Sequence, residues 1–179
     1  MRDKVLDTIE KYEMIGQGDH VCAAVSGGAD SAALLAFLLS LREPMGLTVT
    51  ACHLNHCLRG AEADRDEEHV RRYCQREGIP LEVLKIDVRE EAAKRKLGLE
   101  ACGRAVRYEF FRRLAGENGV IATAHTLSDL AETVLLHLTR GTGLKGLCGI
   151  PPVRENIVRP LIDCSRREIE DYCREHKIP

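Results

Sequence analysis

Short apolar runs alternate along this chain with longer segments in which apolar residues recur every three or four positions. The short runs are rich in Val, Ile, Ala and Cys, as is typical of strands buried on both faces of a sheet, and the longer segments are typical of helices. The pattern predicts strands at 21–25, 47–54, 81–86, 120–124 and 157–162. It predicts helices at 3–15, from a turn at 26–31 to about 44, and at 62–77, 88–96, 100–118, 127–139 and 165–177.

This alternation predicts an α/β fold with a parallel sheet of about five strands and helices on both faces. Ligands of such sheets bind beyond the carboxyl ends of the strands, so polar residues at those ends are the first candidates for function. At 179 residues, the chain is expected to form one domain over 1–179.

Composition narrows the choice of function. The formal net charge of −2 argues against a domain that holds nucleic acid by bulk charge. The sequence has neither the apolar core of a signal peptide nor a run long enough to cross a membrane, so we expect a cytoplasmic protein with no membrane partner. The eight cysteines are scattered without a C-x-x-C pair, which favours reduced thiols without a disulfide or a bound metal.

The first strand runs into the turn Ser26-Gly27-Gly28-Ala29-Asp30-Ser31, which opens a helix. Adjacent glycines let backbone N–H groups close around an anion, and the helix aims its free N–H groups at the same point. The turn lacks the Gly-Lys-Ser/Thr ending of a Walker A loop and the G-x-G-x-x-G of a dinucleotide loop. A phosphate cradle is the functional interpretation, and an ordinary turn capped by Ser and Asp is the structural one.

Two further segments offer polar side chains. The second strand is followed by His53-Leu54-Asn55-His56-Cys57-Leu58-Arg59, whose adjacent His–Cys pairs have poor spacing for structural zinc. The segment is either an ordinary polar loop or, because its strand lies beside the first strand, the wall of a nucleotide pocket. On the helix at 100–118, Arg104, Arg107 and Phe111 share one face. Arg104 either is solvated or reaches phosphate oxygens bidentately.

The segment after the fourth strand has two interpretations. If its helix extends back to His125, then His125, Asp129 and Glu132 share a face that could serve a ligand. Alternatively, Thr126 and Asp129 form a capping box, and Glu132 complements the helix dipole. The glycine-rich stretch at 140–152 is either a connector or a flap that closes over phosphates.

Six motifs together resemble one family. They are Ser26–Ser31; His53-x-Asn55-His56-x-Leu58-Arg59; Glu100-Ala101-x-Gly103-Arg104-x-x-Arg107-Tyr108; Ala124-His125-x-x-x-Asp129-x-x-Glu132-Thr133; the stretch Arg140 to Ile150; and Arg159-Pro160-Leu161. In this order they resemble the tRNA(Ile)-lysidine synthetases, a family of N-type ATP pyrophosphatases in the PP-loop superfamily. The resemblance implies an adenine nucleotide α-hydrolase-like, Rossmann-like fold.

It also implies a ligase that uses ATP and Mg²⁺. Such an enzyme adenylates C2 of the wobble cytidine in a CAU-anticodon tRNA(Ile) and joins free L-lysine there, releasing pyrophosphate and AMP. The resemblance assigns nucleotide binding to Ala24, Ser26, Gly27, Gly28, Ala29, Asp30, Ser31, His53 and Arg104. Asp30 would hold the metal, and the residues implied in catalysis are Asp30, Arg104, His125, Asp129 and Glu132.

Two departures from the family pattern affect these expectations. Ser128 stands where the family carries a carboxylate, and the family continues into C-terminal tRNA-binding domains beyond the catalytic domain. We therefore expect ATP binding with weak tRNA binding, and we allow for a homodimer. The rivals are a PP-loop cytidine thiolase, which would need paired C-x-x-C cysteines, and a non-catalytic nucleotide-binding module, for which Ser128 is the one hint.

Overall fold

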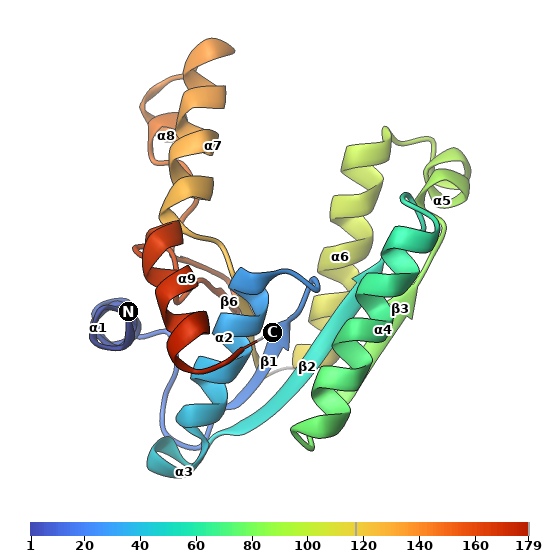
Figure 1. Ribbon diagram of the computed structural model, residues 1–179. Helices are drawn as coiled ribbons and strands as arrows, with labels where there is room; N and C mark the ends of the chain where they lie inside the picture. Colours follow the sequence, from blue (N-terminus) through green and yellow to red (C-terminus); the bar gives the residue numbers. More distant parts are fainter. Residues whose placement is uncertain (117, 179) are drawn as a thin grey trace.

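A computed structural model describes residues 1–116 and 118–178, apart from the side chain of Lys145. Its centre is a six-stranded sheet with the strand order β3-β2-β1-β4-β6-β5 (Figure 1). The strands are β1 (His20–Ala24), β2 (Thr48–Asn55), β3 (Leu81–Lys85), β4 (Val120–Thr123), β5 (Val153–Arg154) and β6 (Ile157–Val158). All neighbours pair in parallel except β5 and β6, which are antiparallel.

Helices cover both faces of the sheet. They are α1 (Arg2–Lys11), α2 (Ala29–Ser40), α3 (Arg42–Met45), α4 (Ala61–Arg76), α5 (Val88–Arg95), α6 (Leu99–Ala115), α7 (Leu127–Thr139), α8 (Leu144–Leu147) and α9 (Arg166–Glu175). The larger core joins α1, α2, α4 and α9 to one face, and α6 packs on the other. The strands supply both cores, since Val21 and Ala23 face the first and Cys22 faces the second. The predicted α/β class with two covered faces is confirmed.

The order of the strands creates a topological switch point. From β1 the chain proceeds to β2 and β3 on one side, and it then returns to place β4 on the other side. The carboxyl ends of β1 and β4 are therefore adjacent. The chain after β1 continues toward one edge of the sheet, and the chain after β4 continues toward the other. A crevice at this point is where open α/β sheets bind ligands.

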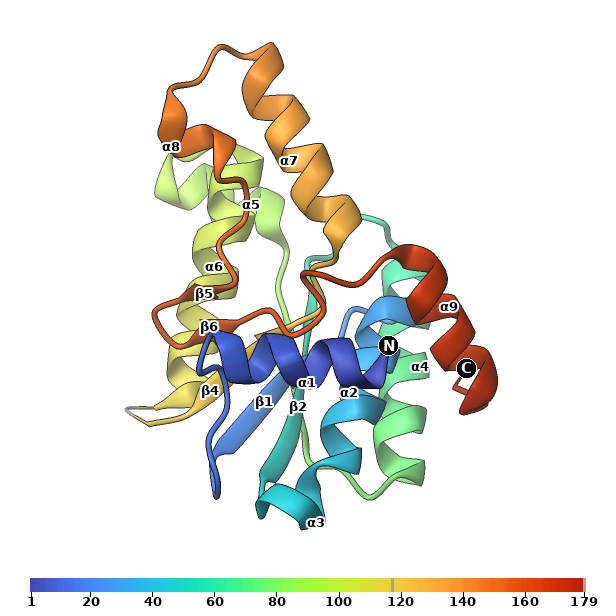
Figure 2. The same cartoon turned by 90° about the vertical axis from the view of Figure 1, so that its left-hand side faces the viewer.

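Helices α2 and α7 both follow strands at this crevice, yet they are packed differently. Helix α2 is apolar nearly all round, and Leu34, Leu35 and Phe37 on it are fully buried. Helix α7 contains no buried residue along its described length. Figures 1 and 2 show α7 and α8 projecting beyond the sheet, so one wall of the crevice stands apart from the core.

The structure corrects several predicted boundaries. The helix predicted at 3–15 ends at Lys11, because Glu13 takes a positive φ of 47°. The helix predicted to reach Pro44 is divided at Leu41 into α2 and α3. The sheet has six strands rather than about five, since the two-residue strand β5 is too short to show an alternating pattern.

Near the site, two predictions also change. The stretch at 140–152 is not all loop, because it contains α8. Helix α7 does not extend back to His125, since Thr126 is an extended N-cap with φ −116° and ψ 176°. Within the described part of the chain, no helix has the length and apolar character needed to cross a membrane.

Candidate functional site: two connected cavities at the carboxyl ends of the strands

The turn after β1 is held by a hydroxyl network. Ser31 Oγ accepts a hydrogen bond from the backbone N–H of Ser26 at 3.1 Å and donates to the carbonyl of Gly28 at 2.9 Å. Gly28 is the N-cap of α2 in an extended conformation, so the first N–H groups of the helix point away from the core. The turn is thus already folded around the position where an anion would bind.

Position 27 requires glycine for two reasons, which are its backbone conformation and its close contact with α4. Its φ of +98° lies where side chains are rarely tolerated. A Cβ at this position would lie 3.1 Å from the Cβ of Asp66 on α4. Glycine at 27 therefore allows the turn to approach α4, and Asp66 becomes a neighbour of the turn.

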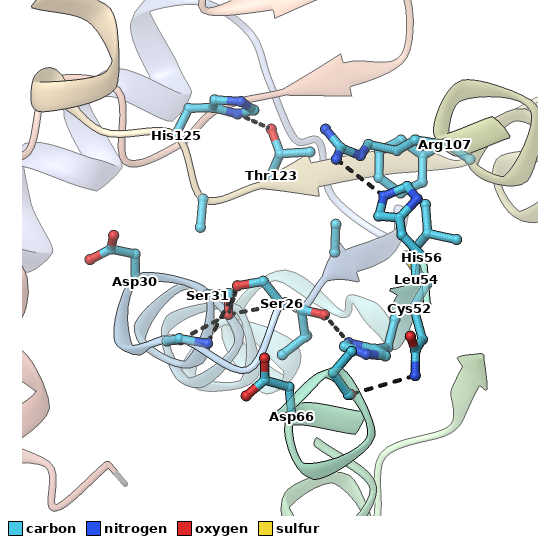
Figure 3. Close-up of a pocket in the computed structure, with 18 of the residues that line it drawn as sticks. Ser26, Asp30, Ser31, Cys52, Leu54, His56, Asp66, Arg107, Thr123 and His125 are labelled. Carbon is cyan, nitrogen blue, oxygen red and sulfur yellow. Dashed lines mark hydrogen bonds between the residues drawn. The ribbon is translucent and has the colours of Figure 1, made fainter. Parts of the chain in front are cut away.

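A cavity of about 460 Å³ opens over this turn (Figure 3). Predicted site residues along its wall are Ala24, Ser26, Gly28, Asp30, Ser31, His53, His125 and Asp129. Four other predicted residues, Gly27, Ala29, Arg104 and Glu132, are not among the described residues that line it. The turn, the end of β2 and the end of β4 thus meet at one cavity, as the sequence predicted.

The histidines after β2 have different partners. His53 is buried, and its Nδ1 donates to the carbonyl of Val25 at 2.7 Å, which leaves Nε2 as an acceptor. His56 Nε2 accepts from Arg107 at 3.4 Å, and its Nδ1 has no partner within the described residues. Burial and the charge of Arg107 hold the pKa of His56 below its ordinary value. The lowered pKa favours the neutral form of the His56 ring.

The side chain of Asn55 forms hydrogen bonds that join β2 to α4. Its amide donates to Asp64 Oδ1 and Glu67 Oε2, both at 3.0 Å, and its oxygen accepts from the backbone N–H of Cys57 at 2.9 Å. These bonds fasten the end of β2 to the start of α4. The Asn of this motif thus positions His53 and His56.

Asp30 carries the charge at the first turn of α2. Burial raises its pKa, the negative charge of Asp129 raises it further, and Arg166 acts in the opposite direction. A carboxylate whose ionisation is disfavoured by burial and by a neighbouring negative charge is a place where a cation is stabilising. One or two carboxylates beside substrate phosphates are a usual ligand set for Mg²⁺, so the oxygen donors present fit that ion. No cluster of three or more His, Cys, Asp or Glu side chains that could hold a metal by itself is found in the described part of the chain.

Asp129 caps helix α7 and also lines the cavity. Its Oδ2 accepts from the backbone N–H of Thr126 at 2.7 Å and from Thr126 Oγ1 at 3.0 Å, so the capping interpretation is confirmed. The residue also lines the cavity. The cap fixes the carboxylate at the mouth of the crevice, and capping and ligand contact are compatible.

His125 lies after β4 on the boundary of this cavity. Its Nδ1 lies 3.0 Å from Thr123 Oγ1, which donates its own proton to the carbonyl of Val158 at 3.4 Å. Nδ1 therefore carries the ring proton, and Nε2 has a free lone pair. Burial lowers the pKa of His125, as does the nearby charge of Arg159. The ring is a neutral base at pH 7.

A second cavity of about 520 Å³ adjoins the first. Both are lined by Arg107, Phe111, Thr123, His125 and Asp129, so the two are continuous. Helix α6 supplies Arg104, Arg107 and Tyr108 to the second cavity, and α7 supplies Asp129, Glu132 and His137. One wall is basic and the other acidic. Arg104 is thus placed beside the second cavity, whereas Arg107, one turn further along α6, reaches both.

Comparison with known proteins agrees with this arrangement. A family model described as a PP-loop domain matches residues 2–179. The chain belongs to the PP-loop family. This family uses ATP.

The PP-loop chain has curated relatives over nearly its full length. It is 46% identical to a tRNA(Ile)-lysidine synthase of Clostridium tetani and 42% identical to one of Clostridium acetobutylicum, each over 99% of this chain. A tRNA(Ile)-lysidine synthase of Pseudothermotoga lettingae is 44% identical over 98% of the chain. In each case the match covers 39% of the relative, so this chain spans about two fifths of their length.

Solved structures support the PP-loop fold at lower identity. A U34-tRNA thiolase from Methanococcus maripaludis superposes with a TM-score of 0.78 at 17% identity, over 99% of this chain and 62% of that one. An NH3-dependent NAD synthetase from Campylobacter jejuni gives 0.60 at 16% identity, over 98% and 71%. At these identities the likeness concerns the fold.

The PP-loop site also includes Asp66, to which the sequence gave no role, and two arginines, Arg59 and Arg159, which the sequence named only as parts of longer motifs. Arg59 and Asp66 line the first cavity and form an ion pair at 3.2 Å. Arg159 lines the second cavity and is 4% exposed. The sequence signal for Arg159 was its place in the motif Arg159-Pro160-Leu161.

Proposed function

We propose that this chain carries out the ATP-dependent joining of lysine to C2 of the wobble cytidine in a CAU-anticodon tRNA(Ile). The observation that carries the proposal is identity of 42–46% over nearly the whole chain with proteins named tRNA(Ile)-lysidine synthase. The two connected cavities support it, because the reaction needs a nucleotide and an amine on either side of one reacting base.

In this proposal ATP occupies the first cavity. The N–H groups of Gly27 and Gly28 and the hydroxyls of Ser26 and Ser31 hold the pyrophosphate that leaves. Ala24 and His53 flank the adenosine. Arg107 contacts the phosphates from the shared wall, a role that the sequence gave to Arg104 and that its position beside the second cavity makes less direct.

Mg²⁺ is the proposed metal, and Asp30 is its proposed protein ligand. When bound, Mg²⁺ neutralises the charge that develops on the phosphates. Asp30 stands on the first turn of α2 beside the turn that would cradle them, and Asp129 lines the same cavity. The residues present therefore suit a metal that is bound jointly by protein and substrate.

The reacting cytidine enters where the two cavities join. Its C2 oxygen attacks the α-phosphorus, forming an O–P bond, and the bond from that phosphorus to pyrophosphate breaks. The lysine amine gives a proton to Nε2 of His125, forms the bond to C2, and AMP leaves with the oxygen. The neutral state of His125 fits this role as a base. Asp129 and Glu132 are the candidates to hold the lysine ammonium that does not react, or the metal.

The test uses mass spectrometry of a CAU-anticodon tRNA incubated with the protein, ATP, Mg²⁺ and L-lysine. The expected result is lysidine at the wobble position, absent without lysine. ATP–pyrophosphate exchange is measured in parallel with tRNA present. Neither lysidine nor exchange from a protein that binds ATP would identify a non-catalytic nucleotide-binding module. Sedimentation of the same sample tests the homodimer.

A further inference from the structure

Arg59 lines the first cavity, and its ion pairs are long. Its Nη2 lies 3.2 Å from Asp66 Oδ2, and its Nη1 lies 3.4 Å from Glu62 Oε1. A tighter pair is present on α4, where Arg71 Nη2 lies 2.8 Å from Glu67 Oε1. Charge-assisted hydrogen bonds span about 2.7–2.9 Å, and exposed ion pairs contribute little to stability. The guanidinium of Arg59, whose side chain is 61% exposed, is therefore free to take another partner.

Asp66 brings this ion pair to the turn that would hold the phosphates. A Cβ at Gly27 would lie 3.1 Å from the Cβ of Asp66, and Figure 3 shows the Asp66 side chain next to the turn. The carboxylate of Asp66 thus stands beside the N–H groups that are proposed to hold pyrophosphate. An anion bound there is repelled by Asp66 and attracted by Arg59, so the two side chains act on it with opposite signs.

The charges of the first cavity make Arg59 important for binding a polyphosphate. Its described charged residues are the carboxylates Asp30, Asp66 and Asp129 and the arginines Arg59 and Arg107. The carboxylates outnumber the arginines, so a polyphosphate gains from both arginines as well as from a metal. Arg107 lines both cavities, which places it at their junction, whereas Arg59 is among the described residues of the first cavity and not of the second. Arg59 is therefore the arginine placed on the side of the turn.

We propose that Arg59 binds the β- and γ-phosphates of ATP and that Asp66 competes with these phosphates for its guanidinium. Without nucleotide, Asp66 holds Arg59 beside the turn. When ATP binds, Arg59 turns to the phosphate oxygens, which its planar fork meets bidentately, and Asp66 is left facing them. Once the bond between the α- and β-phosphates has broken, Asp66 draws Arg59 back and repels the free pyrophosphate. The inference rests on the proposed function, to which it adds a phosphate-binding residue and a cause of rapid product release.

The test compares ligands with and without the outer phosphates. Calorimetry in Mg²⁺ buffer measures pyrophosphate, ATP and AMP, which lacks the β- and γ-phosphates. Arg59→Met should weaken binding of pyrophosphate and ATP by about tenfold and change that of AMP by less than about twofold. Asp66→Asn removes the competing charge, so pyrophosphate should bind at least about threefold tighter and dissociate more slowly by the same factor. The two substitutions therefore change pyrophosphate affinity in opposite directions.

Arg72 and Glu68 provide a matched control pair. They also lie on α4, are exposed, and stand 3.7 Å apart, but neither is among the described residues that line the cavity. Arg72→Met and Glu68→Gln should leave all three affinities unchanged. Arg59→Lys keeps the charge and loses the planar fork, so its pyrophosphate affinity should lie between those of wild type and Arg59→Met. If Arg59→Met does not fold, Arg59→Lys and Asp66→Asn decide the question.

Four outcomes would overturn the proposal. If both substitutions weaken pyrophosphate binding equally, the ion pair only fastens the loop after β2 to α4. If Arg59→Met leaves pyrophosphate affinity unchanged, Arg59 does not contact the phosphates. If Asp66→Asn weakens binding only when Mg²⁺ is present, Asp66 is a metal ligand. If Asp66→Asn leaves the dissociation rate unchanged, Asp66 does not promote product release.

These outcomes are distinct from failure of the proposed function. A wild-type protein that binds neither ATP nor pyrophosphate would contradict the proposed function and this inference together. A protein that binds ATP and forms lysidine, with Arg59→Met behaving as wild type, would contradict this inference alone.

Discussion

The two cavities share a wall but are built in different ways. The first depends on a short turn whose hydroxyls and carbonyls bond to each other within six residues. The second is lined by long side chains from α6, α7 and the segment after β6, which are remote in sequence. A local turn can be shaped before any ligand binds, and a site made of long side chains on separate elements gains its form from the packing of those elements. The comparison teaches that the first cavity is preorganised by local hydrogen bonds and the second by the packing of distant elements.

The largest expected effect comes from removing the carboxylate of the first cavity. Asp30→Ala should reduce lysidine formation by on the order of 100-fold or more, because the metal loses its protein ligand. Calorimetry should show that the Mg²⁺-dependent part of ATP binding falls and the Mg²⁺-independent part persists. Asp3→Asn on α1 is the control. If ATP affinity falls equally with and without Mg²⁺, Asp30 maintains the shape of the turn and is not the metal ligand.

Gly27→Ala tests whether the turn must be preformed. The added Cβ meets both a φ of +98° and the Cβ of Asp66, so we expect a loss of about 1–3 kcal/mol in the free energy of unfolding and ATP binding weakened by about tenfold. Gly18→Ala is a matched control, since its φ is +77° and its Cβ would have no atom within 4 Å. If ATP affinity changes equally in both variants, the cause is backbone strain. If it changes in Gly27→Ala alone, the cause is the close approach of α4.

Glu132→Gln should affect the second cavity alone. We expect the KM for lysine to rise by about tenfold, because a charge-assisted contact to an ammonium group is lost, with ATP affinity unchanged. Glu10→Gln on α1 serves as the control. A parallel fall in ATP affinity would show that the cavities act as one site.

Binding of tRNA is a further test of the two cavities, because neither of them supplies a broad basic surface for the tRNA backbone. With a net charge of −2, the chain is expected to hold tRNA weakly and to lose that binding further as salt rises. Filter binding at matched salt should show affinity at least about tenfold below that of a protein as long as the relatives. Equal affinity would mean that this domain carries its own tRNA recognition.

The smallest expected effect is the pH dependence of the lysine step. The pKa of His125 lies below its ordinary value of 6.5, so the neutral base is present at pH 7 and is lost as pH falls through that lowered pKa. Single-turnover transfer of lysine from preformed adenylated tRNA should therefore stay flat from pH 8 to 7 and decline by a few fold in more acid buffer. His125→Gln should remove this decline. A profile with its midpoint above 6.5 would assign the base to another group.

The sequence by itself determined the alternation of strands and helices and the turn at 26–31, and it offered the cap at Thr126 as one of two interpretations. Each of these depends on neighbours within a few positions: a run of apolar residues, adjacent glycines, or a hydroxyl three residues before a carboxylate. Local patterns of this kind are governed by backbone sterics and short-range hydrogen bonds, so they can be read without the fold.

Only the tertiary structure decided which residues share a cavity. It placed Arg104 beside the second cavity and Arg107 at both, and it brought Asp66 to Gly27 across the β2–α4 connection. It also buried Arg159, whose Nε has no hydrogen-bond partner among the described residues, a fact that depends on how the chain after β6 packs against Pro151. Burial and unmet hydrogen bonds are properties of long-range packing, since the same residue in an exposed loop would be solvated at no cost.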